Sequence, residues 1–254
     1  MTDFSYQLYS SRNFPPLEQT LKMLAEAGYK KVEGVAGMIV GHQDPAWLRT
    51  QLDMNGLAMP SMHVGLDMLE DDPAQVVSLA RTLGVKAIVV PYLVAEERPT
   101  DKAGWHSLGE RVERAGAPMR DAGLTVAWHN HDFEFRPLPD GTLPIDVLLE
   151  GGKDLKLELD LAWVKVAGHD PVDFIRKYGD RLIAVHVKDV APAGECSDED
   201  GWADVGHGVM NWPPIAAVVP DSASCHLVME HDNPNDHKRF AERSIQSARQ
   251  IWSA

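Results

Sequence analysis

Residues 181–189, RLIAVHVKD, form an apolar run that carries an imidazole and an ammonium group near its end. Four other apolar runs also place histidine or carboxylate side chains near their ends: GLAMPSMHV (56–64), LTVAWHNH (124–131), DLKLELDLAW (154–163) and CHLVMEHD (225–232). Because the carboxyl ends of parallel strands meet at one edge of a sheet, this recurrence predicts a parallel sheet whose strand ends share one pocket.

Three further apolar runs complete a regular alternation of strand-like and helix-like segments. They are YQLYS (6–10), KKVEGV (30–35) and KAIVVPYL (86–93). Eight strands separated by helices, within 254 residues, match the dimensions of a (β/α)8 barrel. We therefore predict an α/β fold, a TIM barrel that forms one domain over residues 1–254.

The segments between the strands have the periodicity and the end signals of helices. Asp72 followed by Pro73 is a common helix start, and Gly28 is a common signal just after a helix end. A doubly wound open sheet is the rival fold, but YSSRNFPP (9–16) lacks the glycine-rich phosphate turn that would follow its first strand. The predicted helices span residues 15–27, 44–55, 72–83, 102–122, 144–149, 170–178, 212–219 and 237–252, and residues 191–209 are predicted to form a long loop.

The composition limits the partners of the chain. A formal net charge of −14 argues against nucleic acid and against anionic membrane surfaces as general partners. The first residues, MTDFSYQLYS, contain neither a basic segment nor a long apolar stretch, so we expect no signal peptide, no membrane span and a cytoplasmic location. Cys196 lies in an acidic segment and Cys225 in an apolar one, which predicts no disulfide framework and fits a reducing compartment.

Metal-binding and acid–base side chains follow six of the predicted strands. In barrels of this kind the working residues lie at the carboxyl ends of the strands. A mixed set of carboxylates and imidazoles without a thiolate suits Mn²⁺, Mg²⁺, Co²⁺ or Zn²⁺ and does not single out one of them. The candidates are Glu33, His63, His129, Asp160, His186 and Glu230.

Some of these side chains also allow a structural role. His63 could be a hydrogen-bonded core histidine, and its alternative role is a substrate contact. Glu158 and Asp160 point to one face of their strand, where one of them could pair with a lysine. We predict that Asp160 is the metal ligand and that Glu158 supports it. His186, between two valines, and Glu230, before a turn, are predicted metal ligands because of their places in the strand order.

The stretch HNHDFEF (129–135) is dense in polar groups and allows two assignments. His129 and His131 share one strand face, and Glu134 follows in the loop. Either His129 or Glu134 could complete the coordination of a metal, while the other contacts substrate or moves a proton. A solvated loop without a chemical role is the plain alternative.

The chain contains, in this order, the motifs HNHDFEF, LELDLAWVKVAGHDP, RLIAVHVKD, VGHGVMNW and LVME. Together they resemble the sugar phosphate isomerase/epimerase family of the xylose isomerase-like TIM barrel superfamily, and the resemblance spans essentially the whole chain. It implies a divalent metal held by an acid after strand five and by Asp160, His186 and Glu230. Ketose epimerases carry a glutamate where this chain has His129, which leaves the first ligand open between His129 and Glu134.

The AP endonuclease branch of the same superfamily resembles this chain less well. That branch uses additional metals and histidines, and it has a histidine where this chain has Trp163. An aromatic side chain there suits stacking on the apolar face of a sugar ring. The acidic net charge also opposes DNA binding, which depends on neutralising phosphates.

The resemblance implies a metal-dependent isomerase or epimerase that acts on a keto-sugar, a hydroxy-sugar, a cyclitol or a 3-keto-glycoside. In such a mechanism the metal polarises a carbonyl, a carboxylate removes the neighbouring proton, and an enediolate forms. We predict Glu230 and Glu134, or His129 in place of Glu134, as the proton-transfer pair. The alternatives are a dehydratase of the inosose dehydratase type, which expels a hydroxyl group after the same first step, and a sugar-binding barrel without activity.

Other residues are predicted to contact the substrate or to assist. Lys188, two residues beyond His186, could hold an oxyanion or a phosphate, or could pair with Asp160 or Glu158. The predicted partner is a small sugar or polyol, and a homo-oligomer is compatible with the sequence. The predicted substrate contacts are Glu33, His63, His131, Trp163 and His207.

Overall fold

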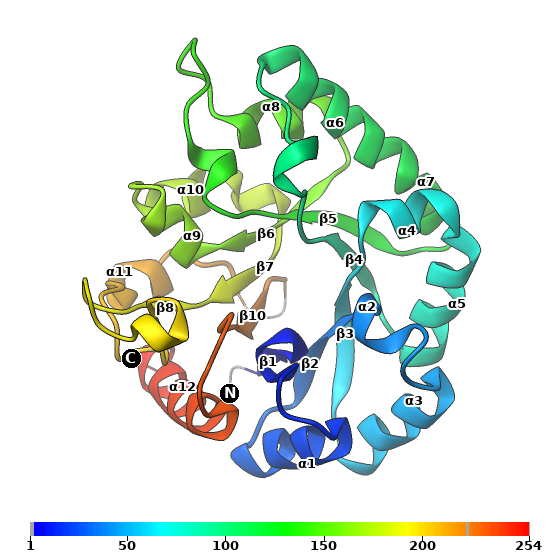
Figure 1. The fold of residues 1–254 in the computed structure, drawn as a ribbon, viewed down its shortest axis with the longest axis vertical. Coiled ribbons are helices and arrows are strands. Elements are labelled where there is room, and N and C mark those ends of the chain that lie inside the picture. Colours follow the sequence, from blue (N-terminus) through cyan, green and yellow to red (C-terminus); the bar gives the residue numbers. More distant parts are fainter. Residues whose placement is uncertain (1–2, 222–223, 254) are drawn as a thin grey trace.

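Eight parallel strands close into a barrel, and helices surround it (Figure 1). The computed structural model describes residues 3–221 and 224–253. Each barrel strand pairs with the next one along the chain, and the first closes the ring against the last, so the predicted TIM barrel is confirmed. The barrel strands are β1 (Phe4–Gln7), β2 (Lys31–Val35), β3 (Ala58–His63), β4 (Ala87–Val90), β5 (Thr125–His129), β6 (Lys156–Asp160), β7 (Leu182–Val187) and β10 (His226–Met229).

The predicted helices are present, with two kinds of difference. The helix predicted over 102–122 divides at Gly116, because Pro118 lacks the backbone N–H that an unbroken helix would need. Short helices, too brief to show a period in the sequence, also follow three strands: α2 (Ala36–Ile39), α4 (Leu66–Asp71) and α9 (Leu161–Val166). The outer helices are α1 (Leu17–Ala27), α3 (Pro45–Met54), α5 (Pro73–Leu83), α6 (Lys102–Ala115), α7 (Ala117–Asp121), α8 (Pro144–Gly151), α10 (Pro171–Tyr178), α11 (Trp212–Ala216) and α12 (His237–Ile251). The 3-10 helices are η1 (Leu8–Ser11), η2 (Ala95–Glu97), η3 (Phe133–Phe135), η4 (Gly179–Arg181) and η5 (Ser197–Glu199).

Aspartates fix the starts of several helices. Asp72 accepts a hydrogen bond from the backbone N–H of Gln75 at 2.9 Å, as its place before Pro73 predicts. An N-cap of this kind stabilises a protein by about 1 kcal/mol. The same arrangement occurs at Asp44, Asp101, Asp170 and Asp236. Within residues 3–221 and 224–253, no helix has both the length and the apolar character needed to span a lipid bilayer.

The main core lies between the barrel and the outer helices. Strand side chains such as Val32, Ile88 and Leu157 are fully buried there. The inside of the barrel differs, because near the carboxyl ends of the strands it holds buried charged side chains such as Glu33 and Glu158. Burying such groups costs free energy unless they are paired or bind a ligand, so this polar interior is the first structural sign of a site.

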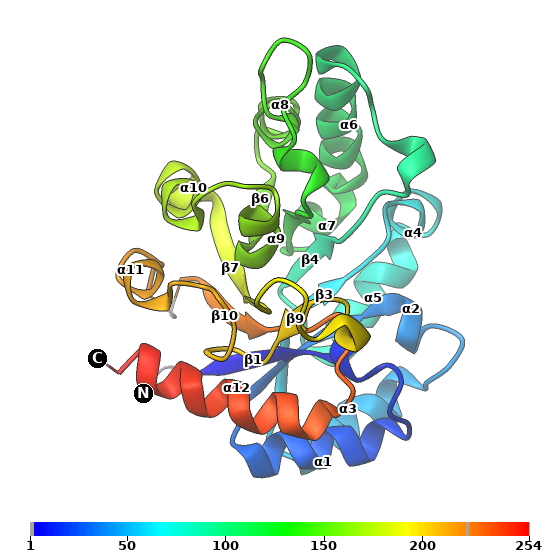
Figure 2. The ribbon, with the colours of Figure 1, turned by 60° about the vertical axis from the view of Figure 1, so that its left-hand side comes forward.

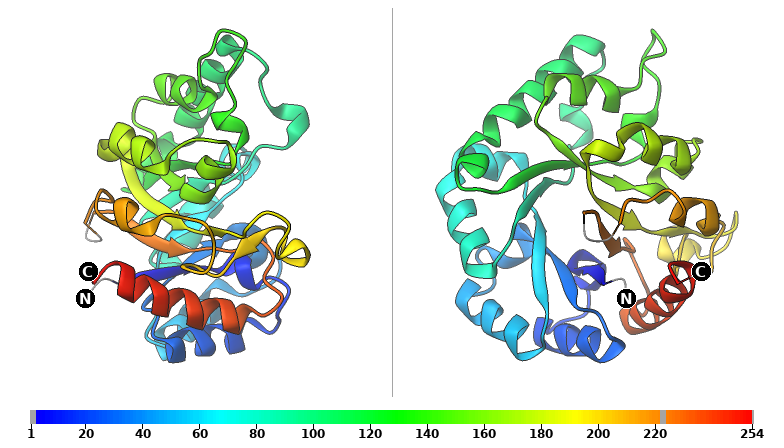
Figure 3. Two further views of the ribbon diagram at one scale, coloured as in Figure 1. Left: turned by 90° about the vertical axis from the view of Figure 1, so that its left-hand side faces the viewer. Right: turned by 180° about the vertical axis from the view of Figure 1, so that it is seen from behind.

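The segment predicted as a long loop contains a short antiparallel strand pair, β8 (Asp189–Val190) and β9 (Trp202–Ala203). In Figure 2, β9 lies in front of the barrel strands. The left view of Figure 3 shows this segment, in yellow, on the same end of the barrel as η2. Strands of two residues have no detectable periodicity, which is why the sequence indicated only a loop.

The Asp189 carboxylate ties this segment to the end of β7. Its Oδ1 accepts the backbone N–H groups of Val190 at 2.9 Å and Met210 at 3.0 Å. Its Oδ2 accepts the backbone N–H of Gly206 at 2.8 Å and the indole N–H of Trp212 at 2.9 Å. These four donors satisfy a carboxylate that has no exposed surface, so both ends of the segment are held at one buried side chain.

Helices α6 and α8 pack in backbone contact. A Cβ atom on Gly109 would overlap the carbonyl oxygen of Leu148, and one on Gly151 would overlap the carbonyl oxygen of His106. Only glycine permits such a close approach of two backbones. The packing of this helix pair therefore depends on two residues that have no side chain.

We expect Gly109→Ala to lower the free energy of unfolding by about 1–3 kcal/mol, because the added methyl group must push α8 away from α6. Urea denaturation followed by circular dichroism measures this change. Gly37→Ala is the matched control, since a Cβ atom there would have no atom within 4 Å. Equal stability of the two variants would show that the helix contact is not needed.

Candidate active site

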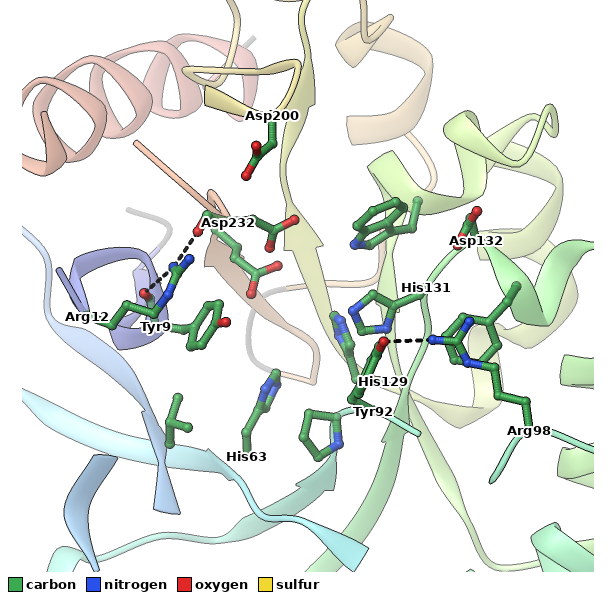
Figure 4. A pocket seen from close by; sticks show the side chains of 15 residues that line it. Tyr9, Arg12, His63, Tyr92, Arg98, His129, His131, Asp132, Asp200 and Asp232 are labelled. Atoms are coloured by element: carbon green, nitrogen blue, oxygen red, sulfur yellow. Dashed lines mark hydrogen bonds between the residues drawn. The ribbon is translucent and has the colours of Figure 1, made fainter. Parts of the chain in front are cut away.

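A cavity of about 550 Å³ opens at the carboxyl ends of the barrel strands (Figure 4). Its walls combine aromatic rings with charged groups. Figure 4 shows His63, His129 and His131 on one side of the cavity and Asp200 and Asp232 on another. Its lining includes Tyr9, Arg12, His63, Tyr92, Arg98, His129, His131, Asp132, Phe133, Trp163, Asp200, Glu230 and Asp232.

Four buried side chains converge beside this cavity, and we call them the outer cluster: His129, Asp160, His186 and Glu230. Each offers one nitrogen or oxygen atom, and these four atoms lie within 4.8 Å of one another. His186 Nδ1 lies 2.8 Å from Glu230 Oε2 and 3.8 Å from Asp160 Oδ2. The structure thus brings together residues at the carboxyl ends of four consecutive barrel strands, β5, β6, β7 and β10.

A second group, the inner cluster, lies against the first and consists of Glu33, His63 and Glu158 together with the shared His129 and His186. Glu158 Oε1 lies 2.7 Å from His63 Nε2, 2.9 Å from His186 Nε2 and 3.2 Å from His129 Nδ1. Glu33 Oε1 lies 2.9 Å from His186 Nε2 and 3.2 Å from His63 Nε2. The carboxylates of the inner cluster therefore face three imidazole rings at once.

The pKa values of these buried acids and imidazoles depend on the charges of their neighbours. Burial by itself lowers the pKa of His186, but the carboxylates of Glu158 and Glu230 outweigh burial and hold that pKa well above its usual range. Burial raises the pKa of Glu33, but His63 and His186 hold it well below its usual value. Without such partners, charged groups with no exposed surface would neutralise.

One oxygen of the Asp160 carboxylate is fixed by hydrogen bonds, and the other accepts none from the described residues. Its Oδ1 accepts the backbone N–H groups of Ala162 and Trp163, both at 2.9 Å, and so caps α9. Asn130 fixes the end of β6 through its side-chain oxygen, which accepts the Asp160 N–H at 2.9 Å. Oδ2 of Asp160 is buried and has no hydrogen-bond partner among the residues that the structure describes.

This oxygen, which has no hydrogen bond and lies 3.8 Å from both His186 Nδ1 and the Lys188 ammonium, tests whether the site suits a metal ion. A buried carboxylate oxygen without a donor is unusual and costs free energy, and a bound cation would satisfy it. The outer cluster adds two imidazoles and a second carboxylate, which are the donor types that Mn²⁺, Co²⁺ and Zn²⁺ prefer, with Mg²⁺ favouring the carboxylates. The residues present therefore fit a divalent metal.

The two candidates in HNHDFEF have different surroundings. His129 belongs to the outer cluster, but Glu134 lies in η3, and its carboxylate is used elsewhere. Glu134 Oε1 accepts the indole N–H of Trp128 at 3.0 Å, and Oε2 accepts the backbone N–H of His131 at 2.9 Å. Burial raises the pKa of Glu134 to about 8. The structure therefore brings His129, and not Glu134, to the other predicted ligands.

Lys188 is buried directly beside the outer cluster. Its ammonium lies 2.6 Å from Asp232 Oδ2, 3.4 Å from Glu230 Oε2 and 3.8 Å from Asp160 Oδ2. Burial lowers the pKa of Lys188, but the carboxylates of Asp232 and Glu230 raise it above its usual value. Of the pairings expected from the sequence, the structure shows the one with Asp160, and Asp232 is the nearer partner.

The other predicted substrate contacts are placed differently. His63, His131 and Trp163 line the cavity, and Glu33 lies beneath it in the inner cluster. His207 is exposed on the segment after β9, and it does not line the cavity. Its backbone N–H donates a hydrogen bond to the carbonyl oxygen of Asp204.

One cavity residue, Arg98, has no signal in the sequence that would identify it as part of the site. Arg98 lies 3.6 Å from the ring centre of Phe133 and donates to the Tyr92 hydroxyl at 2.8 Å. It lies just after η2, outside any periodic segment. Asp232 is different, because its place two residues after Glu230 could have identified it.

Residues 21–251 match the family described as xylose isomerase-like TIM barrel. The chain belongs to this family. The resemblance to sugar phosphate isomerases and epimerases is thereby confirmed at the level of the superfamily. Proteins similar to this chain are named as an inosose dehydratase, a sugar phosphate isomerase/epimerase and a D-psicose 3-epimerase.

Individual relatives are more distant. The chain is 28% identical to an inosose dehydratase of Geobacillus kaustophilus over 196 residues, which are 68% of this chain and 62% of that relative. It thus spans less than two thirds of the length of the curated relatives that it matches. A sugar phosphate isomerase/epimerase from Parabacteroides distasonis has the same fold, with a TM-score of 0.78 and 21% identity, covering 99% of this chain and 94% of that one. The IOLI protein, solved with a bound zinc atom, has a TM-score of 0.76 at 14% identity, covering 100% of this chain and 98% of that one.

We expect Lys188→Met to lower the free energy of unfolding by about 3 kcal/mol, because it removes the buried positive charge that balances the carboxylates of Asp232 and Glu230. Lys177→Met is the control: its ion pair with Asp146 is largely exposed, so less than about 1 kcal/mol should be lost. Denaturant titration compares the two. Similar losses would mean that the buried ammonium does not balance the cluster.

Proposed function

We propose that this protein is a divalent-metal-dependent enzyme that removes the proton next to a carbonyl group of a keto-sugar or keto-cyclitol. The observation that carries the proposal is the buried Oδ2 of Asp160, which has no hydrogen bond within the described residues and lies among the donors of the outer cluster. Two buried clusters of acids and imidazoles at the floor of an open cavity are costly to maintain, and catalysis accounts for that cost.

Asp160, His186, Glu230 and His129 would hold the metal. When bound, the ion would supply Lewis-acid polarisation of the substrate carbonyl. The inner cluster supports this role, since Glu158 and Glu33 occupy Nε2 of His186 and leave its Nδ1 facing Asp160 and Glu230. A carboxylate behind a ligand histidine orients the ring and increases its basicity.

Glu230 is the proposed base. It lines the cavity, and its Oε2 is held by His186 at 2.8 Å and by Lys188 at 3.4 Å. No hydrogen bond between described residues occupies its Oε1, which is thus available to accept a proton. Lys188, anchored by Asp232, positions this carboxylate and offsets the negative charge that develops on the substrate.

Return of the proton to another carbon or face would make the enzyme an isomerase or epimerase, as the resemblance implies. Dehydration is the second candidate, and two observations favour it. Glu134, the predicted second acid–base group, is turned to Trp128 and away from the outer cluster. The curated relatives that the chain matches are named inosose dehydratase. Both outcomes share the same first step at Glu230.

We expect metal to stabilise the wild-type protein and Asp160→Asn to remove most of that effect. A metal at one hundred times its dissociation constant adds about 2.7 kcal/mol, which raises the melting temperature by several degrees. Calorimetry with Mn²⁺, Co²⁺, Zn²⁺ and Mg²⁺ added to chelator-treated protein measures the shift. Asp173→Asn, on the exposed side of α10, is the control. An undiminished shift in Asp160→Asn would refute the assignment of the ligand.

We expect the Mn²⁺-loaded protein to exchange the α-proton of a keto-sugar or keto-cyclitol in D₂O, as followed by proton NMR. Exchange without loss of water identifies an isomerase or epimerase, and a product lighter by one water identifies a dehydratase. Glu230→Gln should reduce the rate at least roughly 100-fold, because the acceptor of the proton is removed.

The metal content of Glu230→Gln is measured in parallel, since this residue is also a proposed ligand. Full turnover with metal bound would show that Glu230 is not the base. Binding of sugars without any exchange by the wild type would indicate a sugar-binding barrel and overturn the enzymatic proposal.

A further inference from the structure

We propose that the substrate has two linked rings and that the second, uncharged sugar ring binds in a separate cavity beside the catalytic one. This inference rests on the proposed function, which places the reacting ring next to Glu230. It adds the size and the charge of the substrate, which the proposed function leaves open.

The second cavity has a volume of about 470 Å³ and lies between α9 and the segment from Val190 to Trp202. It shares Trp163, Asp200 and Asp232 with the catalytic cavity. Figure 4 shows Asp200 and Asp232 near one another at the edge of the catalytic cavity, on the side away from Arg98. Because the same side chains border both cavities, one ligand can extend from the first into the second.

The wall between the two cavities is an aromatic side chain in a fixed position. The Trp163 ring packs edge-on against Trp202, with ring centres 4.7 Å apart and planes at 75°. The ammonium of Lys188 lies 5.0 Å from the Trp163 ring centre and 4.1 Å from that of Trp202. Indole rings held in this way offer a rigid surface to the apolar face of a sugar ring.

The rest of the second cavity is apolar at one side. Val166 lines it with 46% of its surface exposed, and Pro192 and Ala193 lie opposite on the segment after β8. An exposed valine beside a tryptophan is suited to the C–H face of a ring. The outer wall is held by its own hydrogen bonds, from Ala191 N–H to the carbonyl of Gly201 and within the β8–β9 pair. The cavity is therefore built into the fold.

The charged side chains that line the second cavity disfavour a phosphate group. Its ionisable lining residues within the described chain are Glu195, Asp200 and Asp232, and all three are acidic. Carboxylates accept hydrogen bonds from sugar hydroxyls but repel phosphate. Arg12 and Arg98 line the catalytic cavity and do not line the second one. The second ring is therefore neutral and rich in hydroxyl groups, as in a glycoside.

The test compares disaccharides with their own components on the full chain in the presence of Mn²⁺. Isothermal titration with maltose, trehalose, cellobiose, lactose and sucrose, and with glucose, galactose and fructose, gives the affinities. We expect at least one disaccharide to bind roughly tenfold more tightly than either of its components, because the second ring stacks in the second cavity. If no disaccharide exceeds its components, the inference is wrong.

The variant Ala193→Trp tests whether the second ring of a disaccharide binds in the second cavity. Ala193 is exposed, lines only the second cavity and takes no part in the proposed catalysis. The bulky ring should remove the tenfold advantage and leave monosaccharide affinity within about twofold. Ala193→Ser, which fills no comparable volume, should keep the advantage. A disaccharide preference that survives Ala193→Trp would place the second ring elsewhere and refute the inference.

Proton exchange in D₂O separates this inference from the proposed function. If keto-monosaccharides exchange their α-proton but no disaccharide shows an advantage, only the second-ring site is refuted. If disaccharides bind more tightly and lose that advantage in Ala193→Trp, but no keto form of any size exchanges a proton, the catalytic proposal fails and the second-ring site stands.

Discussion

The imidazole of His186 lies between carboxylates on both of its ring nitrogens, and the rest of the site depends on this arrangement. Nδ1 faces Glu230 at 2.8 Å, and Nε2 faces Glu33 and Glu158 at 2.9 Å. A histidine without exposed surface can be held so only if the strands around it keep their register, because a shift of one residue would turn the ring to the other face. The closed barrel fixes this register. The two clusters fill the inside of the barrel near the carboxyl ends of the strands, where apolar side chains would otherwise form a core.

The sequence predicts the barrel well because each strand is an apolar run with its own boundaries. The ligand set follows from the same logic: Asp160, His186 and Glu230 each stand near the end of such a run, and the closed barrel brings these ends together. The choice at the fifth strand does not follow in this way. Whether His129 or Glu134 joins the cluster depends on the turn after β5, where η3 directs Glu134 to Trp128.

The inner cluster could not be derived from spacing. Glu33, His63 and Glu158 come from β2, β3 and β6. The contacts of His63 with Glu158 and of Glu33 with His186 cross the inside of the barrel between strands that are not neighbours. Alternation along a strand predicts that a side chain points inward but gives no information on which side chain it meets there. The two short strands after β7 were also beyond reach of the sequence, since their pairing depends on the buried Asp189 and not on a pattern of apolar residues.

Both ends of the Val190–Trp212 segment are fastened to the single carboxylate of Asp189, and Glu199 and Asp204 tie its interior to α12 through Arg239. Because the bonds to Asp189 go mostly to backbone groups, exposed side chains between these anchors can change without loss of the bonds. The fold thus separates the reactive groups from the segment that borders the second cavity. The reactive groups lie on the barrel strands. Changes of side chain in the segment that borders the second cavity can adapt one proton-abstracting centre to substrates of different shape.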